Sequence, residues 1–166
     1  MRSKKSLIPL LLPILLLIAA IYLLTYYPAD GTARAALESS GTVAVEATPY
    51  GWRFDGPSRD RALVFYPGAK VDAAAYAPLM RRLAAAGLDA CLVKMPFHLA
   101  VFDVNAADRV MRAHPYEHWY VGGHSMGGAI AARYAADHPV DGLILCAAYP
   151  IQPLPDGMVE VVIYGS

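Results

Sequence analysis

The sequence has little charge, few cysteines and no excess of basic residues. Only 17% of its 166 residues are Asp, Glu, Lys or Arg, and 14 basic residues balance 14 acidic ones. Because binding to phosphate backbones requires a basic surplus, this balance argues against nucleic acid as a main partner. Hydrophobic residues make up 57% of the chain. Such a content excludes a disordered or low-complexity protein.

The longest uncharged stretch lies near the N-terminus, from Leu7 to Tyr27. A helix over this stretch would be roughly 30 Å long, which is the thickness of the hydrocarbon core of a bilayer. Basic residues precede it within residues 1–6, and tyrosines cluster near its far end, as at a membrane interface. The sequence therefore predicts a cytoplasmic tip over 1–6, a single-pass anchor in the cell membrane over 7–27, and an extracytoplasmic remainder.

A cleaved signal peptide is the alternative interpretation of this stretch. Signal peptides have an apolar core of about 7–15 residues, followed closely by a site of small residues. Here the apolar run is longer, and the nearest Ala-x-Ala site, Ala33 to Ala35, lies well beyond it. These lengths favour an uncleaved anchor that contacts the lipid bilayer.

Beyond the anchor, residues 28–60 are predicted to form a stalk and edge structure, and residues 61–166 a folded domain. Within that domain, short apolar runs alternate with amphipathic stretches. An alternation of strands with helices indicates a mostly parallel sheet covered on both faces, the α/β class. The expected strands are 61–66, 88–94, 118–122, 142–148 and 158–164, and the expected helices are 73–86, 103–113 and 126–137.

One motif carries chemistry: the sequence G-H-S-M-G from Gly123 to Gly127. It lies between a predicted strand and a predicted helix, which is the context of a nucleophile elbow. In such an elbow the serine, here Ser125, occupies a strained turn that exposes its hydroxyl above the sheet. The turn is too tight for side chains two residues before and two after the serine, which explains both glycines. The pattern predicts that Ser125 is a nucleophile.

At this point the sequence resembles a known family. The segment GGHSMGG resembles the elbow of the α/β-hydrolase superfamily, and FYPGAKV at 65–71 resembles a strand followed by its oxyanion loop. The segments 94–103 and 118–128 together resemble a bacterial group of membrane-anchored proteins similar to dienelactone hydrolases. The resemblance covers about residues 60–166 and implies an α/β-hydrolase fold.

The resemblance also implies roles for residues around the serine. The backbone N–H of Met126 would supply one oxyanion donor, and the N–H of Ala69 the other, with Gly68 allowing the close approach. His124 is expected to be structural, and His98 to be a loop residue. The implied reaction cleaves an ester, thioester or related acyl bond of a small molecule. No His, Asp, Glu or Cys cluster has metal-ligand spacing, so no cofactor is expected.

The strand order of the α/β-hydrolase fold would place the strands as 88–94, 61–66, 118–122, 142–148 and 158–164. Cys91 and Cys146 would then lie three strand spacings apart, about 14 Å. A disulfide requires Cα atoms within roughly 7 Å of each other, so both thiols are expected to be free.

The acid and the histidine of a catalytic triad are not expected in this chain. In the fold, an Asp or Glu and then a His follow the serine. The one histidine after Ser125 is His138, which with Asp137 ends the elbow's own helix, too far from the serine. We therefore expect a chain cut short before its acid and base. Two alternatives stay open: a noncatalytic membrane-tethered fragment or binding domain, and a non-hydrolytic enzyme on the same fold, such as an acyltransferase or cofactor-free haloperoxidase.

Overall fold

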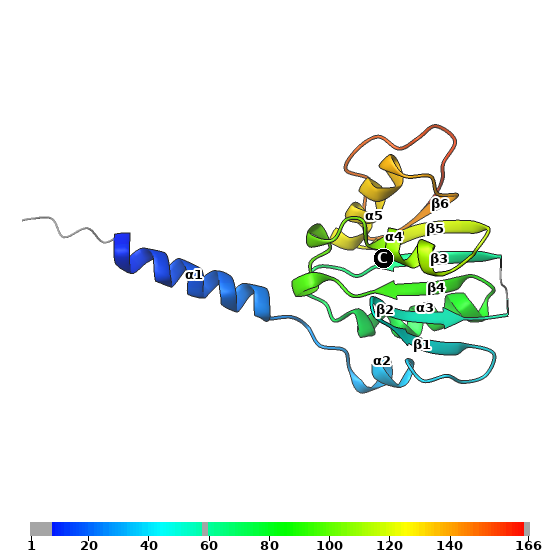
Figure 1. Ribbon diagram of the computed structural model, residues 1–166, viewed down its shortest axis with the longest axis horizontal. Helices are drawn as coiled ribbons and strands as arrows, with labels where there is room; N and C mark the ends of the chain where they lie inside the picture. The colour runs from blue at the N-terminus through cyan, green and yellow to red at the C-terminus, as the bar shows by residue number, and fades with distance from the viewer. Residues whose placement is uncertain (1–7, 58–59, 165–166) are drawn as a thin grey trace, which may run out of the picture.

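A computed structural model describes residues 8–57 and 60–164. These residues form one seven-stranded sheet with the strand order β1-β2-β4-β3-β5-β6-β7 (Figure 1). Strands β3 to β7 run parallel, while β2 pairs antiparallel with both β1 and β4. The strands are β1 (Ala44–Thr48), β2 (Gly51–Asp55), β3 (Arg61–Tyr66), β4 (Asp89–Val93), β5 (His118–His124), β6 (Gly142–Cys146) and β7 (Val159–Ile163).

The predicted fold class and the predicted order of the five parallel strands are confirmed. Strand β3 lies between β4 and β5, and residues 62–66 of β3 are fully buried. A continuous apolar run is what a strand buried on both faces requires, because helices cover each face of a parallel sheet. The helices are α1 (Ile8–Leu24), α2 (Gly31–Ala35), η1 (Ala73–Tyr76), α3 (Ala77–Ala85), η2 (Pro96–His98), η3 (Ala100–Phe102), α4 (Ala106–Ala113) and α5 (Met126–Asp137).

The two larger clusters of buried side chains lie one on each face of the sheet, and a small third cluster joins Ala29, Ala33 and Ala74. Leu63 and Phe65 pack with Met80 of α3 on one face, whereas Val64 and Tyr66 pack with α4 and α5 on the other. Successive side chains of a strand point to opposite faces, so one strand supplies both clusters. Burial on both faces holds the carboxyl end of β3 firmly in place.

Residues 28–60 contain more than a stalk. Strands β1 and β2 lie at the edge of the sheet, beyond β4, and extend it to residue 44, before the predicted domain start at residue 61. The buried carboxylate of Asp89 accepts a hydrogen bond from the Gly56 N–H at 2.7 Å, which ties the end of this segment to the sheet. The edge structure expected here is thus a hairpin, whose pairing the sequence did not predict because its strands are short and surrounded by turn-forming residues.

Helix α1 extends away from the sheet (Figure 1). The apolar side chains along it are exposed, for example Leu15, Leu17 and Ile18. Of the helices within residues 8–57 and 60–164, none is both long and apolar enough to cross a membrane. The anchor predicted over 7–27 is thus not confirmed, and the predicted tip, 1–6, lies outside the described residues.

Both cysteines are free, as predicted from their strand positions. In the native chain, we expect Cys91 to resist Ellman's reagent, because burial raises the pKa of its thiol to about 12 and the thiolate is the reactive form. Cys146 is half-buried and should react faster, although burial raises its pKa as well. In denaturant without reductant, both thiols should titrate. Cys146→Ser should abolish the fast native reaction; titration of no thiol after unfolding would indicate a disulfide.

Candidate functional site

Ser125 lies at the sharp turn between β5 and α5, and its backbone has φ 52° and ψ −125°. A residue with a side chain seldom adopts this conformation, which costs about 1–3 kcal/mol. The Ser125 N–H donates to the carbonyl of Cys146 on the neighbouring strand at 3.0 Å, and the residue is exposed. The structure thus shows the strained, exposed serine that the motif predicts.

The glycines of the elbow allow a close approach of two loops. A Cβ atom on Gly127 would lie 2.2 Å from the carbonyl oxygens of both Tyr66 and Pro67, and one on Gly123 would lie 2.5 Å from that of Tyr66. Backbone atoms cannot give way as a flexible side chain can, so no larger residue fits at either position. Gly123 and Gly127 are therefore small because the backbone at the end of β3 packs directly against them.

A chain of hydrogen bonds connects this loop to the elbow. The Gly68 N–H donates to Tyr76 Oη at 3.1 Å, and Tyr76 Oη lies 2.9 Å from His124 Nδ1. Because the tyrosine oxygen accepts from Gly68, its own proton is free to be donated to His124. Burial raises the pKa of Tyr76, which keeps the hydroxyl protonated. His124 is structural, as expected, and Tyr76 is a positioning residue.

Sequence reasoning missed Tyr76. Tyr76 lay within a predicted helix, with no signal that its hydroxyl reaches back to the residue before Ser125. The close approach expected at Gly68 is present, because a Cβ here would lie 2.7 Å from His124 Nδ1, and the Gly68 N–H is bonded to Tyr76. Among the described residues, neither Ala69 nor Met126 has a hydrogen-bond acceptor for its N–H. Both amides are therefore open to a ligand.

Strained residues gather at the carboxyl edge of the sheet. Each of β3, β4, β5 and β6 is followed by at least one non-glycine residue with positive φ: Lys70, Phe97, His98, Ser125 and Ala147. Ligands of open α/β sheets bind at this edge, where neighbouring strands connect in opposite directions. Strand β3 connects onward to β4 on one side and pairs with β5 on the other, so Ser125 lies at such a switch point.

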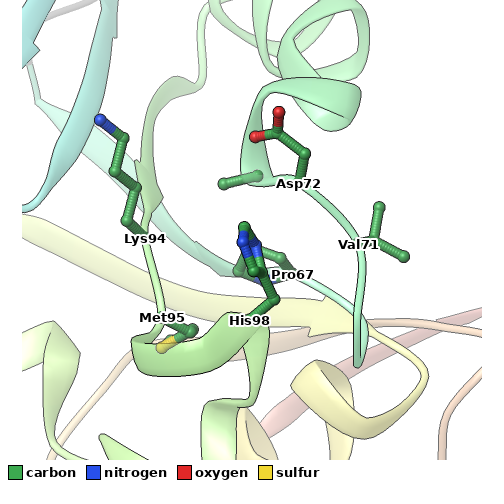
Figure 2. Close-up of a pocket in the computed structure, with 7 residues that line it drawn as sticks. Pro67, Val71, Asp72, Lys94, Met95 and His98 are labelled. Atoms are coloured by element: carbon green, nitrogen blue, oxygen red, sulfur yellow. The ribbon is translucent and has the colours of Figure 1, made fainter. Parts of the chain in front are cut away.

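A cavity of about 170 Å³ opens at the same edge, between the ends of β3 and β4. His98 and Lys94 come from the loop after β4, and Asp72 comes from the loop after β3 (Figure 2). Lys94 Nζ lies over the ring of Trp52, 4.1 Å from its centre, and the carboxylate of Asp72 caps η1 through the N–H of Ala74. His98, expected to be an ordinary loop histidine, thus lines a cavity close to the oxyanion loop.

The described residues place no acid–histidine pair at Ser125. His138 stacks on Tyr134 at the far end of α5, a helix of 12 residues and thus about 18 Å long. Asp141 binds His118 and the Trp119 N–H, at the start of β5. Within the described ranges, no group of three His, Cys, Asp or Glu side chains could hold a metal ion.

The comparisons with known proteins agree with this geometry. The sequence model of the alpha/beta hydrolase family matches residues 62–165. The chain belongs to the alpha/beta hydrolase family. This family match covers β3 to β7, including the elbow and the loop after β3. Among curated protein sequences, none matches the chain.

Solved structures show the same alpha/beta hydrolase fold. A carboxyl esterase from the fungus Tuber melanosporum superposes with a TM-score of 0.54 at 12% identity, over 73% of this chain and 48% of the esterase. A bacterial heroin esterase gives 0.52 at 19% identity, over 78% and 56%. The protein DphMB1 gives 0.51 at 20% identity, over 79% and 56%. The chain spans about half the length of these proteins.

Tyr76→Phe tests the positioning role of the hydroxyl. Without it, the Gly68 N–H and His124 Nδ1 lose their partner, so the free energy of unfolding should fall by about 1–3 kcal/mol. Urea unfolding followed by circular dichroism measures this change. Tyr27→Phe is the control, because the Tyr27 side chain is exposed and should tolerate the same change without loss. Equal stability of the two variants would contradict the assigned role.

Proposed function

We propose that this protein is a serine hydrolase that cleaves an ester, thioester or related acyl bond through an acyl-enzyme at Ser125. The observation that carries the proposal is an exposed serine in a strained turn beside two backbone N–H groups, those of Met126 and Ala69, that have no acceptor among the described residues. Catalysis of acyl transfer depends on such donors, because they stabilise the negative charge that develops on the carbonyl oxygen. The N-terminus of α5 adds a favourable dipole.

In the proposed reaction, Ser125 Oγ attacks the acyl carbon and forms an ester with it. The bond to the alkoxide or thiolate leaving group breaks, and the leaving group takes up the proton that the serine loses. Water then hydrolyses the acyl-enzyme, which releases the acid and restores the hydroxyl. A general base must carry these protons, and the described residues do not supply one at Ser125.

A small-molecule ester is the substrate class that the similar structures favour. Two of the three are esterases by name, one acting on heroin. The second candidate function is a noncatalytic binding domain at the membrane, favoured by the lack of an acid–histidine pair beside Ser125 within the described ranges. The hydrolase requires a reactive Ser125 hydroxyl, whereas the binding domain does not.

A fluorophosphonate probe tests this reactivity in the protein expressed from its complete reading frame. We expect covalent labelling that disappears in Ser125→Ala, because the probe reports an activated serine. Ser39→Ala is the matched control, since Ser39 is an exposed serine whose hydroxyl bonds to Val45 far from the elbow. Labelling that persists in Ser125→Ala would show that another residue is the reactive one and would contradict the proposal. Labelling of no variant would support the noncatalytic alternative.

We also propose that the N-terminal apolar segment attaches the chain to the cell membrane, with the hydrolase domain outside the cytoplasm. Exposed apolar side chains along α1 support this, because they have no protein partner to cover them. The segment after α1 belongs to the fold: Tyr27 pairs with Val71, and Arg34 bonds to Asp72 at 3.2 Å. Cleavage at Ala33 to Ala35 would remove these contacts, which favours retention over a cleaved signal.

Alkaline carbonate extraction of membranes tests the attachment. The intact chain should stay in the membrane pellet, because apolar burial in lipid does not depend on charge. A variant that lacks residues 8–24 should move to the supernatant. Recovery of the intact chain in the supernatant, or of a mature protein that begins after Ala35, would contradict the anchor.

A further inference from the structure

The N-terminal segment docks directly on the loop that carries the oxyanion donor. The Tyr27 N–H donates to the Lys70 carbonyl at 2.7 Å, and the Asp72 N–H donates to the Tyr27 carbonyl at 2.9 Å. Lys70 Nζ donates to the carbonyl of Leu23 at 3.1 Å, where a cation stabilises the end of a helix. The end of α1 is thereby fixed next to the candidate site.

Aromatic side chains surround the point where the end of α1 meets the loop after β3. Tyr26 stacks on His98 of the cavity, with ring centres 3.9 Å apart, and Lys70 Nζ lies 5.1 Å from the ring centre of Tyr22. Tyrosines and lysines at the end of an apolar helix are typical of the headgroup level of a membrane. The cavity and the oxyanion loop lie at that same level because they contact these residues.

The loop after β4 presents further apolar side chains on this side of the molecule. Phe97 is 50% exposed, Val101 47% and Phe102 55%, and Tyr27, which pairs with the loop after β3, is 74% exposed. Figure 1 shows that α1 leaves the domain from the edge where the parallel strands end. Large apolar groups gathered in this way on a surface mark an interaction site.

Two acidic side chains of this edge are paired. Asp72 is bonded to Arg34, and Asp103 forms an ion pair with Arg109. The two lysines contact uncharged groups: Lys70 is bonded to the end of α1, and Lys94 Nζ lies over the ring of Trp52. Approach of this edge to lipid therefore leaves neither carboxylate without its cation, and the two lysines suit the level of the lipid headgroups.

We propose that the carboxyl edge of the sheet rests on the surface of the lipid bilayer, in contact through Tyr27, Phe97, Val101 and Phe102. The Ser125 site then opens toward the headgroup region. For the serine hydrolase proposed above, on which this step rests, the substrates are acyl esters of amphiphiles that partition into the membrane, and they reach the cavity beside His98 without crossing bulk water.

Tryptophan quenching by brominated phosphatidylcholine vesicles tests the orientation in the whole chain. Tyr27→Trp and Phe102→Trp should lose emission on binding to vesicles, because bromine quenches only tryptophans close to lipid. Val159→Trp is the matched control: Val159 is also an exposed apolar residue, 59% exposed, but it is the first residue of β7, at the amino end of the parallel strands and so opposite this edge. The unsubstituted chain, with Trp52 and Trp119, gives the background.

Quenching of the two edge probes but not of the control supports the proposal. If the chain sediments with the vesicles and the edge probes behave like Val159→Trp, the orientation is wrong while the membrane attachment stands. If the chain does not bind vesicles, both are wrong. None of these readouts uses the chemistry of Ser125, so they fail or succeed independently of fluorophosphonate labelling, which tests the hydrolase itself.

Discussion

The close contact between the chain leaving β3 and the turn after β5 is the constraint on which the site depends. Tyr66 pairs with Gly123 across the two strands, so both strands end at the same level. Their loops then meet with only glycines between them, and a Cβ on Gly127 would lie 2.2 Å from two carbonyl oxygens. This contact sets the position of the loop that carries Ala69 relative to Ser125.

The buried core holds the strained residues at the carboxyl edge of the sheet in their conformations. Each left-handed non-glycine residue costs about 1–3 kcal/mol and persists only where its surroundings leave no alternative. Here the strands that lead into the edge are buried on both faces, with Val64, Phe65 and Tyr66 at 0% exposure. The rigid strands hold Ser125 in a conformation that is unfavourable for an isolated turn.

The segment before the sheet supports the site from the other side. Residues 25–34 bond to the oxyanion loop through Tyr27 and Arg34, and Tyr26 covers His98. A stretch without any periodic pattern thus stabilises the loop next to the nucleophile. Helix α1 and the geometry of the site are connected, because Lys70 belongs to the loop after β3 and also caps the helix.

The sequence by itself determined the alternation of strands and helices, the elbow and the role of its glycines, because these follow from local patterns of apolar and small residues. It also predicted β5 and α5 around Ser125 closely, and α5 begins and ends at the expected residues. The hydrogen bond between Tyr76 and His124, the pairing of β2 with β4 and the docking of Tyr26 on His98 were decided by the tertiary structure alone. Each joins residues that are distant in the chain, 48 positions apart for Tyr76 and His124, and no local pattern records which distant partners the sheet brings together.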